Sequence, residues 1–447
     1  MQINGIKLFN NKYKLIPLND NDSKKSTFKK KNSILKNKTF LLFFLFFIFI
    51  LEFIILLLIE NKQKSNKKYN YFQNINVTKI LLKSNRTIPE DFNDCYYFVK
   101  KAVNHTLINP NEIFNRSENP IISITIPMYN AEGYIENGII AIENQDFKDI
   151  EIIIIDDCSK DNSVEVVKQL MKKDPRINLY QNKETKGTLY SKSLGVKYSK
   201  GKYVLVSDQD DLYTQEDAFS TMYYYLEKYN LDILGFATLF APTSNLRYKP
   251  TLYIFKNTSI LHQPYIRQRM YYVKNKNVRR MGDVIWNYIY KRDVFMESIS
   301  QIDDKIMNTR MNCQEDFLLF FLLTRNAKSL KNIKRIFYAH IYWKNSTKAS
   351  ILFAKKDKEI VKRDYKCLSH INYVEFLLYR TNNTIEDKRI ASFEFNWYLN
   401  HECRNNTFIQ ERTKNVSKLF LENQYIEKDI KERILLFYFQ HSTFSQI

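Results

Sequence analysis

The chain has 447 residues, 44% of them hydrophobic and 15% aromatic, which is enough to bury a large core. With only eight glycines and nine prolines, it cannot be a collagen-like or low-complexity chain. Part of the net charge of +21 comes from the lysine-rich residues 1–38, and the charge of residues 121–447 is spread over that whole range. It forms no dense basic stripe with interleaved aromatic residues, so we expect no nucleic-acid partner. None of the five cysteines is spaced as a CxxC pair, which excludes a zinc ribbon or a thioredoxin-like motif.

The N-terminal part predicts a membrane anchor between two polar segments. Residues 1–38 are polar and rich in lysine, and we expect them to form a cytoplasmic tail. Residues 39–59 carry one charge, Glu52, and a helix of about 20 apolar residues can cross a bilayer. Residues 60–119 are polar with mixed charge and are typical of a stem. The lysines before the anchor and the Asn-x-Ser/Thr acceptors beyond it predict a single-pass type II glycoprotein of the Golgi or endoplasmic reticulum membrane, with a lumenal catalytic domain.

From residue 121 onward, strands and helices alternate with short connections. Apolar runs predict strands at 121–127, 150–155, 177–181 and 203–206, and helical spacing predicts helices at 131–144, 163–173 and 188–198. Strands that are apolar on both faces are typical of a mostly parallel sheet with helices on both faces, and such α/β sheets bind ligands beyond the carboxyl ends of their strands. Residues 355–447 keep helical periodicity and predict a helical C-terminal appendage.

Two acidic clusters directly follow predicted strands. Asp156 and Asp157 follow the second strand, and the segment 208–211, Asp-Gln-Asp-Asp, follows the fourth. Both clusters are therefore expected at the ligand edge of one sheet, where carboxylates repel one another unless a cation compensates. The alternative is that they cap helices, but Asp161 and a capping box at 214–217 are expected to supply those caps. The pattern predicts a divalent cation, Mn²⁺ or Mg²⁺, bound by oxygen ligands.

Three segments resemble glycosyltransferase family 2 in their order and spacing. They are Ile124-Thr-Ile-Pro-Met-Tyr-Asn130, Glu151-Ile-Ile-Ile-Ile-Asp-Asp-Cys-Ser-Lys-Asp161 and Gly201-Lys-Tyr-Val-Leu-Val-Ser-Asp-Gln-Asp-Asp211. Further on, the segment that begins at Trp286 resembles an acceptor-side segment of the family, and Gln314-Glu-Asp316 resembles its catalytic Glu-Asp motif. The resemblance implies a GT-A fold for residues 120–354 and a nucleotide-diphospho-sugar as donor.

The resemblance also implies roles for individual residues. A nucleotide pocket would be lined by Pro127, Tyr129, Glu132, Asp156, Asp157, Lys186 and Gly187. Asp208 would contact the ribose or the metal, Asp210 would ligate the metal, and Asp316 would be the general base with Glu315 shaping the acceptor site. The chain departs from the family where Lys192-Ser193 stands in place of the frequent Arg-Asn and where Cys158 replaces a glycine. The first departure leaves the ribose-side contacts open.

The function follows from what sugar transfer requires. A base must take the proton of the acceptor hydroxyl, and a divalent cation can stabilise the departing diphosphate. His340 is either a further metal ligand or a packed core residue. One base without a second carboxylate nucleophile indicates inversion. We predict a metal-dependent, inverting hexosyltransferase or N-acetylhexosaminyltransferase that uses a UDP-sugar and a hydroxyl of a glycan, protein or lipid. The alternative is a catalytically inactive GT-A-like membrane protein that binds nucleotide-sugar or glycan.

Overall fold

A computed structural model describes residues 113–242, 251–275, 277–282, 284–342, 356–380, 384–399 and 407–422, together with residues 428, 431, 432 and 435. The predicted tail, the predicted anchor at 39–59 and most of the predicted stem lie outside these residues. Among the residues that are described, no helix is both long enough and apolar enough to cross a membrane.

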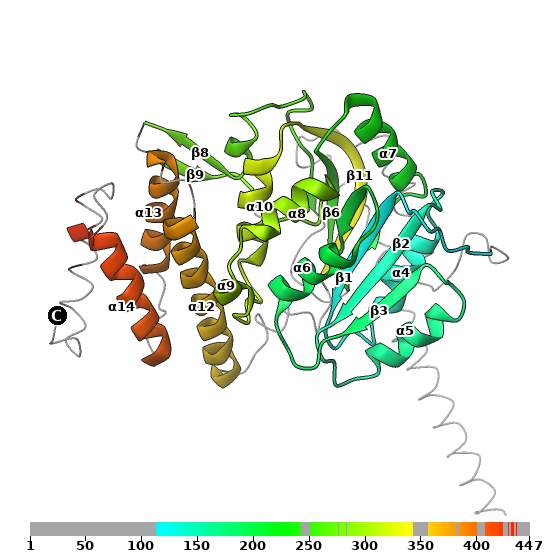
Figure 1. Cartoon of the computed structure of the whole chain (residues 1–447), viewed down its shortest axis with the longest axis horizontal. Helices are drawn as coiled ribbons and strands as arrows, with labels where there is room; N and C mark the ends of the chain where they lie inside the picture. Colours follow the sequence, from blue (N-terminus) through cyan, green and yellow to red (C-terminus); the bar gives the residue numbers. More distant parts are fainter. Residues whose placement is uncertain are drawn as a thin grey trace, which may run out of the picture. The chain divides into compact units, whose positions relative to one another are not determined.

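The centre of the fold is a mostly parallel nine-stranded sheet (Figure 1). Its strands run in the order β3-β2-β1-β4-β10-β6-β11-β5, with β7 paired to β6. The first four strands of the chain are parallel neighbours: β1 (Ile122–Met128), β2 (Ile150–Asp156), β3 (Ile177–Gln181) and β4 (Tyr203–Val206). All four predicted strands are confirmed. Because they run in one direction, the ends of β1, β2 and β4 lie at the same edge of the sheet.

Helices cover both faces of the sheet, as predicted. One face is covered by α4 (Ile135–Glu143), α5 (Ser163–Met171) and α7 (Ala218–Tyr229), and the other by α6 (Thr188–Tyr198), α8 (Arg292–Ser300) and α10 (Glu315–Asn326). Strand β4 shows why both faces need cover. Val204 and Val206 pack on the α6 side, whereas Tyr203 and Leu205 pack on the α4 side.

Helix α6 lies unusually close to β1 because of a glycine. A Cβ atom at Gly195 would lie 2.9 Å from Cβ of Thr125, so a larger residue there would push the helix away from the sheet. The close approach places Lys192, almost one turn earlier on α6, beneath the ligand edge. The prediction of α6 at 188–198 is confirmed residue for residue.

The second half of the sheet mixes strand directions. Strand β10 (Tyr288–Lys291) is antiparallel to β4 and to β6 (Ile233–Pro242), whereas β11 (Leu330–Tyr342) is parallel to β6. The remaining strands and short helices are β5 (Leu212–Tyr213), β7 (Thr251–Tyr253), the hairpin β8 (Tyr271–Lys274) and β9 (Asn277–Arg280), η1 (Arg267–Arg269) and α9 (Asp304–Met307). Strand β11 carries His340 back to the ligand edge, beside the segment that follows β4.

The C-terminal part is helical and consists of α12 (Lys356–Arg380), α13 (Ile385–Leu399) and α14 (Thr407–Glu422). Helix α12 lies beside α10, α13 lies beside β9, and α14 packs against α12 (Figure 1). Their apolar residues belong to the same hydrophobic core as those of α8 and α10. A buried polar contact strengthens the junction, since the Tyr271 hydroxyl and the Arg280 guanidinium both donate hydrogen bonds to the carboxylate of Glu394. The C-terminal helices therefore support the helix that carries Glu315 and Asp316.

Candidate active site

The loops that follow β1 and β4 are joined at the ligand edge. The Tyr129 amide donates to Oε1 of Gln209 (2.7 Å), and Nε2 of Gln209 donates back to the Tyr129 carbonyl (3.2 Å). Tyr129 is 41% exposed, and Pro127 is half-buried at the end of β1. The predicted pocket residues of β1 thus lie next to the acidic segment 208–211.

The carboxylates at the end of β2 are saturated by the chain itself. Asp156 accepts from the Ser159 amide (3.2 Å) and from Nε2 of Gln181 (3.3 Å). Asp157 accepts from the backbone amides of Lys186 (2.7 Å) and Gly187 (2.9 Å) and from Nδ2 of Asn182. These bonds bring Asp157, Lys186 and Gly187 together, as predicted for one pocket. They also show that Asp157 holds the loop before α6.

The structure places Glu132 away from the segment after β4 and contradicts the predicted capping box at 214–217. Glu132, in the β1–α4 loop, is exposed, and its carboxylate accepts a hydrogen bond from the Asn162 amide (2.8 Å). It therefore contacts the β2–α5 loop rather than the segment after β4. The predicted capping box at 214–217 is wrong, because the Thr214 hydroxyl donates to the carbonyl of Ile336, and Asp217 pairs with Arg335. Thr214 is fully buried beside β11 and cannot reach the first turn of α7.

A candidate cation site lies between the segment that follows β4 and strand β11. One ligand atom from each of Asp208, Asp211 and His340 lies within 4.8 Å of the others. Nδ1 of His340 is 2.8 Å from Oδ2 of Asp211, and the Ile341 amide donates to Oδ1 of the same carboxylate (2.9 Å). Because Asp211 engages Nδ1, the nitrogen that could bind a cation is Nε2. Trp286 stacks on the imidazole, with ring centroids 5.1 Å apart and planes 6° apart. His340 is therefore packed against the core and also lies next to the carboxylates of Asp208 and Asp211.

The charges of this cluster fit a cation. Burial, together with the carboxylates of Asp211 and Asp208, raises the pKa of Asp210 to about 8. Burial also raises the pKa of Asp211, although His340 opposes the rise. Carboxylates that resist ionisation because of their neighbours are stabilised as anions by a bound metal ion. Two carboxylates and one imidazole suit Mn²⁺, and oxygen ligands with open positions suit Mg²⁺. Asp210, the predicted ligand, is not in the three-residue group.

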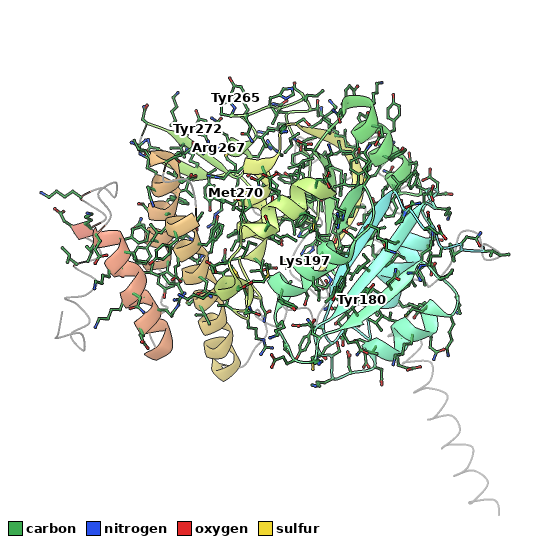
Figure 2. The ribbon with its side chains drawn as sticks, viewed as in Figure 1. Tyr180, Lys197, Tyr265, Arg267, Met270 and Tyr272 are labelled. Carbon is green, nitrogen blue, oxygen red and sulfur yellow. The ribbon has the colours of Figure 1, made fainter. Side chains whose placement is uncertain are left out.

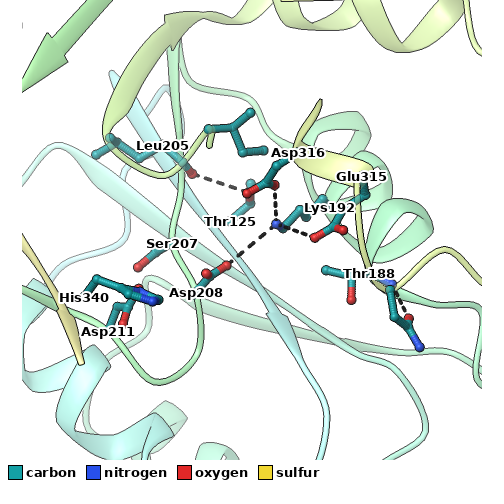
Figure 3. Close-up of polar contacts among 12 residues, drawn as sticks. Thr125, Thr188, Lys192, Leu205, Ser207, Asp208, Asp211, Glu315, Asp316 and His340 are labelled. Atoms are coloured by element: carbon teal, nitrogen blue, oxygen red, sulfur yellow. Dashed lines mark hydrogen bonds and ion pairs between the residues drawn. The ribbon is translucent and has the colours of Figure 1, made fainter. Parts of the chain in front are cut away.

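The predicted catalytic pair begins α10. Glu315 and Asp316 are its first two residues, and both contact the ammonium of Lys192 from α6. Nζ of Lys192 lies 2.6 Å from Oδ1 of Asp316, 3.1 Å from Oε1 of Glu315 and 3.7 Å from Oδ1 of Asp208 (Figure 3). Burial raises the pKa of Asp316 to about 7, with Lys192 acting against the rise and Glu315 and Asp208 adding to it. A carboxylate with that pKa is well matched to proton transfer near neutral pH.

Three residues of the site were not predicted. Lys192 was noted only as a departure from the family pattern, although a lysine inside an otherwise buried helix is itself a signal. The Tyr338 hydroxyl accepts a hydrogen bond from the Asp208 amide (3.0 Å). Gln209 joins the loops that follow β1 and β4 through its hydrogen bond with Tyr129. Nothing in the local sequence around Tyr338 indicates that contact, because it depends on the pairing of β11 in the sheet.

Comparisons with known proteins agree with this geometry. The family model described as glycosyl transferase family 2 matches residues 123–296, which include β1, β2, β4 and the segment 208–211. Over these residues the chain is similar to family 2 glycosyltransferases. The resemblance stated from the sequence motifs is thus confirmed, and so is the α/β GT-A fold.

The relatives are partial matches from bacteria. An uncharacterized glycosyltransferase of Haemophilus influenzae is 38% identical over 21% of this chain and 37% of its own length. The uncharacterized glycosyltransferase EpsJ of Bacillus subtilis is 28% identical over 42% and 52% of the two chains. A Campylobacter jejuni protein, GalNAc(5)-diNAcBac-PP-undecaprenol beta-1,3-glucosyltransferase, is 40% identical over 21% and 30%. The chain thus spans about half or less of the length of these relatives. Among solved structures, S. aureus TarS 1-349 in complex with UDP-GlcNAc has a TM-score of 0.49 and 14% identity over 72% of this chain and 88% of that one, too distant to inform function.

The bacterial origin of these relatives corrects one prediction. A single-pass type II protein of the Golgi or endoplasmic reticulum membrane was expected, and that localisation is wrong, because the similar proteins come from organisms without these compartments. The reasoning failed because it took Asn-x-Ser/Thr acceptors as evidence for a lumenal domain. In a chain so rich in asparagine, such acceptors arise by composition.

Proposed function

We propose that the chain is an inverting glycosyltransferase that transfers a hexose or N-acetylhexosamine from a UDP-sugar to a hydroxyl group. The observation that carries the proposal is that Asp316 and Asp208, which follows β4, contact the same lysine ammonium. The Asp316 carboxylate is mostly buried, and its pKa is raised to about 7. It contacts the ammonium of Lys192, which also contacts Asp208 at the donor edge. The similarity of residues 123–296 to the family supports the reaction class.

The proposed reaction is a single displacement. Asp316 accepts the proton of the acceptor hydroxyl while the oxygen forms a bond to the anomeric carbon from the face opposite the leaving group. The bond from the anomeric carbon to the diphosphate oxygen breaks, and its electron pair leaves with UDP. A direct attack of this kind inverts the anomeric configuration, and no carboxylate of the chain needs to form a covalent intermediate.

We propose that Asp208, Asp211 and His340, with Asp210 beside them, form the site of a divalent metal ion. When bound, Mn²⁺ or Mg²⁺ supplies positive charge that stabilises the diphosphate leaving group. Asp211 orients His340 by accepting its Nδ1–H (2.8 Å), and Trp286 fixes the plane of the imidazole. The nucleotide is proposed to lie over the ends of β1 and β2, beside Pro127 and Tyr129. There the loop at Lys186 and Gly187, whose backbone amides donate to Asp157, shapes the pocket.

The sugar and the acceptor are proposed only by class. The Campylobacter relative is named as a glucosyltransferase, which supports a hexosyl donor. The acceptor is a glycan, protein or lipid hydroxyl that approaches the start of α10. We propose that residues 120–354 form the catalytic domain and that residues 355–447 are a helical region that supports α10 through their shared core.

The test is release of UDP by the purified full chain. UDP-glucose and UDP-N-acetylglucosamine are supplied with Mn²⁺, and UDP is measured with and without a panel of glycan and lipid acceptors. We expect release with at least one donor, loss of release in EDTA, and recovery when Mn²⁺ is restored. Analysis of the product by NMR should show an inverted anomeric centre. Tight UDP-sugar binding without any release would instead support the catalytically inactive alternative.

A further inference from the structure

A buried lysine joins the two halves of the site. The side chain of Lys192 is 2% exposed, yet its ammonium is surrounded by three carboxylates from two different segments (Figure 3). Asp208 comes from the end of β4, at the donor edge, whereas Glu315 and Asp316 come from the start of α10. Of these ammonium contacts, the one to Asp316 is the shortest, at 2.6 Å. Lys192 is thus placed between the proposed cation site and the proposed base.

The helices that carry Lys192 and Asp316 are joined at a second point. The Thr188 amide donates to Oδ1 of Asn312 (3.1 Å), and the Leu189 amide donates to the carbonyl of Met311 (3.1 Å). Thr188 lies one turn before Lys192 on α6, so this face of the helix runs along the segment that leads into α10. The contact is tight, because a Cβ at Gly187 would lie 2.9 Å from Oδ1 of Asn312. The Lys192 ion pairs and the backbone contacts at Thr188 and Leu189 together set the position of the first turn of α10.

Charge explains why one ammonium meets three carboxylates. Burial alone would oppose a charge on Lys192, but the carboxylates of Asp316, Glu315 and Asp208 surround the ammonium and offset that cost. In the proposed reaction Asp316 becomes neutral when it accepts the acceptor proton. The ammonium then still has Glu315 at 3.1 Å and Asp208 at 3.7 Å, so no buried cation is left unpaired. A pair of Lys192 with Asp316 alone would make that proton transfer costly.

We propose that Lys192 is a positioning residue that fixes the base Asp316 at a set distance from the donor-side carboxylate Asp208 and stays paired with a carboxylate during proton transfer. This inference rests on the proposed glycosyl transfer and adds a role that neither the motifs nor the relatives assign to this lysine. It predicts that loss of the ammonium impairs turnover more than donor binding.

The first experiment compares three variants of the full chain by UDP release from UDP-glucose or UDP-N-acetylglucosamine with Mn²⁺. In Lys192→Met we expect kcat to fall by about 10²-fold or more, with the donor KM changed by less than about fivefold. Lys192→Arg keeps the charge and should regain about tenfold of the loss. The control is Lys388→Met, which removes another buried lysine whose Nζ donates only to the Leu378 carbonyl among the contacts seen, far from the carboxylates. It should leave kcat within about twofold of the wild type.

A cycle with Asp316 separates positioning from general damage. If Lys192 acts through the base, Lys192→Met should cost little further turnover once Asp316→Asn has removed the base. Equal losses in both backgrounds would overturn the proposal, and so would a raised donor KM with unchanged kcat, which would make Lys192 a donor-binding residue.

Thermal unfolding gives a readout that needs no activity. Lys192→Met leaves the carboxylates of Asp208, Glu315 and Asp316 buried together without the ammonium, so Tm should fall by several degrees. The double variant Lys192→Met/Asp316→Asn has one carboxylate fewer and should recover part of the lost Tm. Additive Tm changes would overturn the contact itself. A wild-type chain that releases no UDP would refute the proposed function and the catalytic role with it, whereas the Tm cycle would still decide whether Lys192 holds Asp316.

Discussion

The carboxylates at the end of β2 and those around the end of β4 share one sheet edge but are compensated in different ways. Asp156 and Asp157 accept hydrogen bonds from backbone amides and side-chain amides of the chain. The group around Asp208 and Asp316 has the Ile341 amide on Asp211 but otherwise contacts one ammonium and one imidazole, and burial raises the pKa of Asp210 and Asp316. The difference teaches that the β2 pair builds the frame of the pocket, whereas the β4 group is where a cation and a proton would act.

The largest expected effect is the loss of the base. Asp316→Asn keeps the shape of the side chain but cannot accept a proton, so kcat should fall by about 10²- to 10⁴-fold while the donor KM changes little. UDP release with saturating donor and Mn²⁺ measures the loss. The matched control is Asp304→Asn, since Asp304 is exposed in the first turn of α9 and should tolerate the change. Turnover within threefold of the wild type in Asp316→Asn would remove Asp316 from the chemistry.

A smaller effect is expected from the residue that orients His340. Asp211→Asn loses the charged acceptor of the Nδ1–H and should weaken Mn²⁺ binding by about 10- to 100-fold. The measurement is the Mn²⁺ concentration that gives half-maximal UDP release, and excess Mn²⁺ should restore most of the rate. Asp232→Asn is a fair control, because Asp232 is also buried and accepts a backbone amide, that of Lys328 (2.7 Å), at the start of β6. An unchanged Mn²⁺ requirement in Asp211→Asn would contradict the proposed cation site.

The pH dependence should follow the base. Only the ionised form of Asp316 accepts the acceptor proton, so kcat should rise with pH up to about 7 and fall about tenfold per unit below it. The profile is measured at saturating Mn²⁺, because protons also compete with a metal ion for the β4 carboxylates. Asp304→Asn should keep the same profile. A rate that stays level between pH 5.5 and 8 would show that no group with this pKa limits turnover.

The sequence was sufficient for the parts that depend on local pattern. The nearly continuous apolar run of β2, in which every residue is buried, identifies a central parallel strand from the sequence pattern. Parallel neighbours then place Asp156 and Asp208 at one edge, and the structure brings them there. The one clear difference in bounds is α4, which begins at Ile135 rather than at 131 because the amides of Tyr134 and Ile135 both donate to the Ala131 carbonyl in a turn.

The remaining features depend on contacts between distant segments. The Lys192 contact to Asp316 spans 124 residues, and the His340 contact to Asp211 spans 129. Strand β11 is parallel to β6 and antiparallel to β5, a pairing that no local periodicity specifies. Motifs could therefore name Asp316 and His340 as candidates, but they could not show that Lys192 links the base to the donor edge or that Asp211 contacts the imidazole.

The smallest effect on turnover is expected at the β2 end. Asp157→Asn replaces one acceptor oxygen with a donor facing backbone amides, and an unsatisfied buried amide costs about 1–3 kcal/mol of unfolding free energy. Urea unfolding should show that loss, whereas kcat at saturating donor should stay within about threefold and the donor KM should rise as the loop at Lys186 and Gly187 loosens. Asp146→Asn is the control, since this exposed carboxylate accepts from the Ser220 hydroxyl and should change stability by less than about 0.5 kcal/mol. A fall in kcat as large as that of Asp316→Asn would mean that Asp157 takes part in the reaction itself, and the two acidic clusters would then share one role.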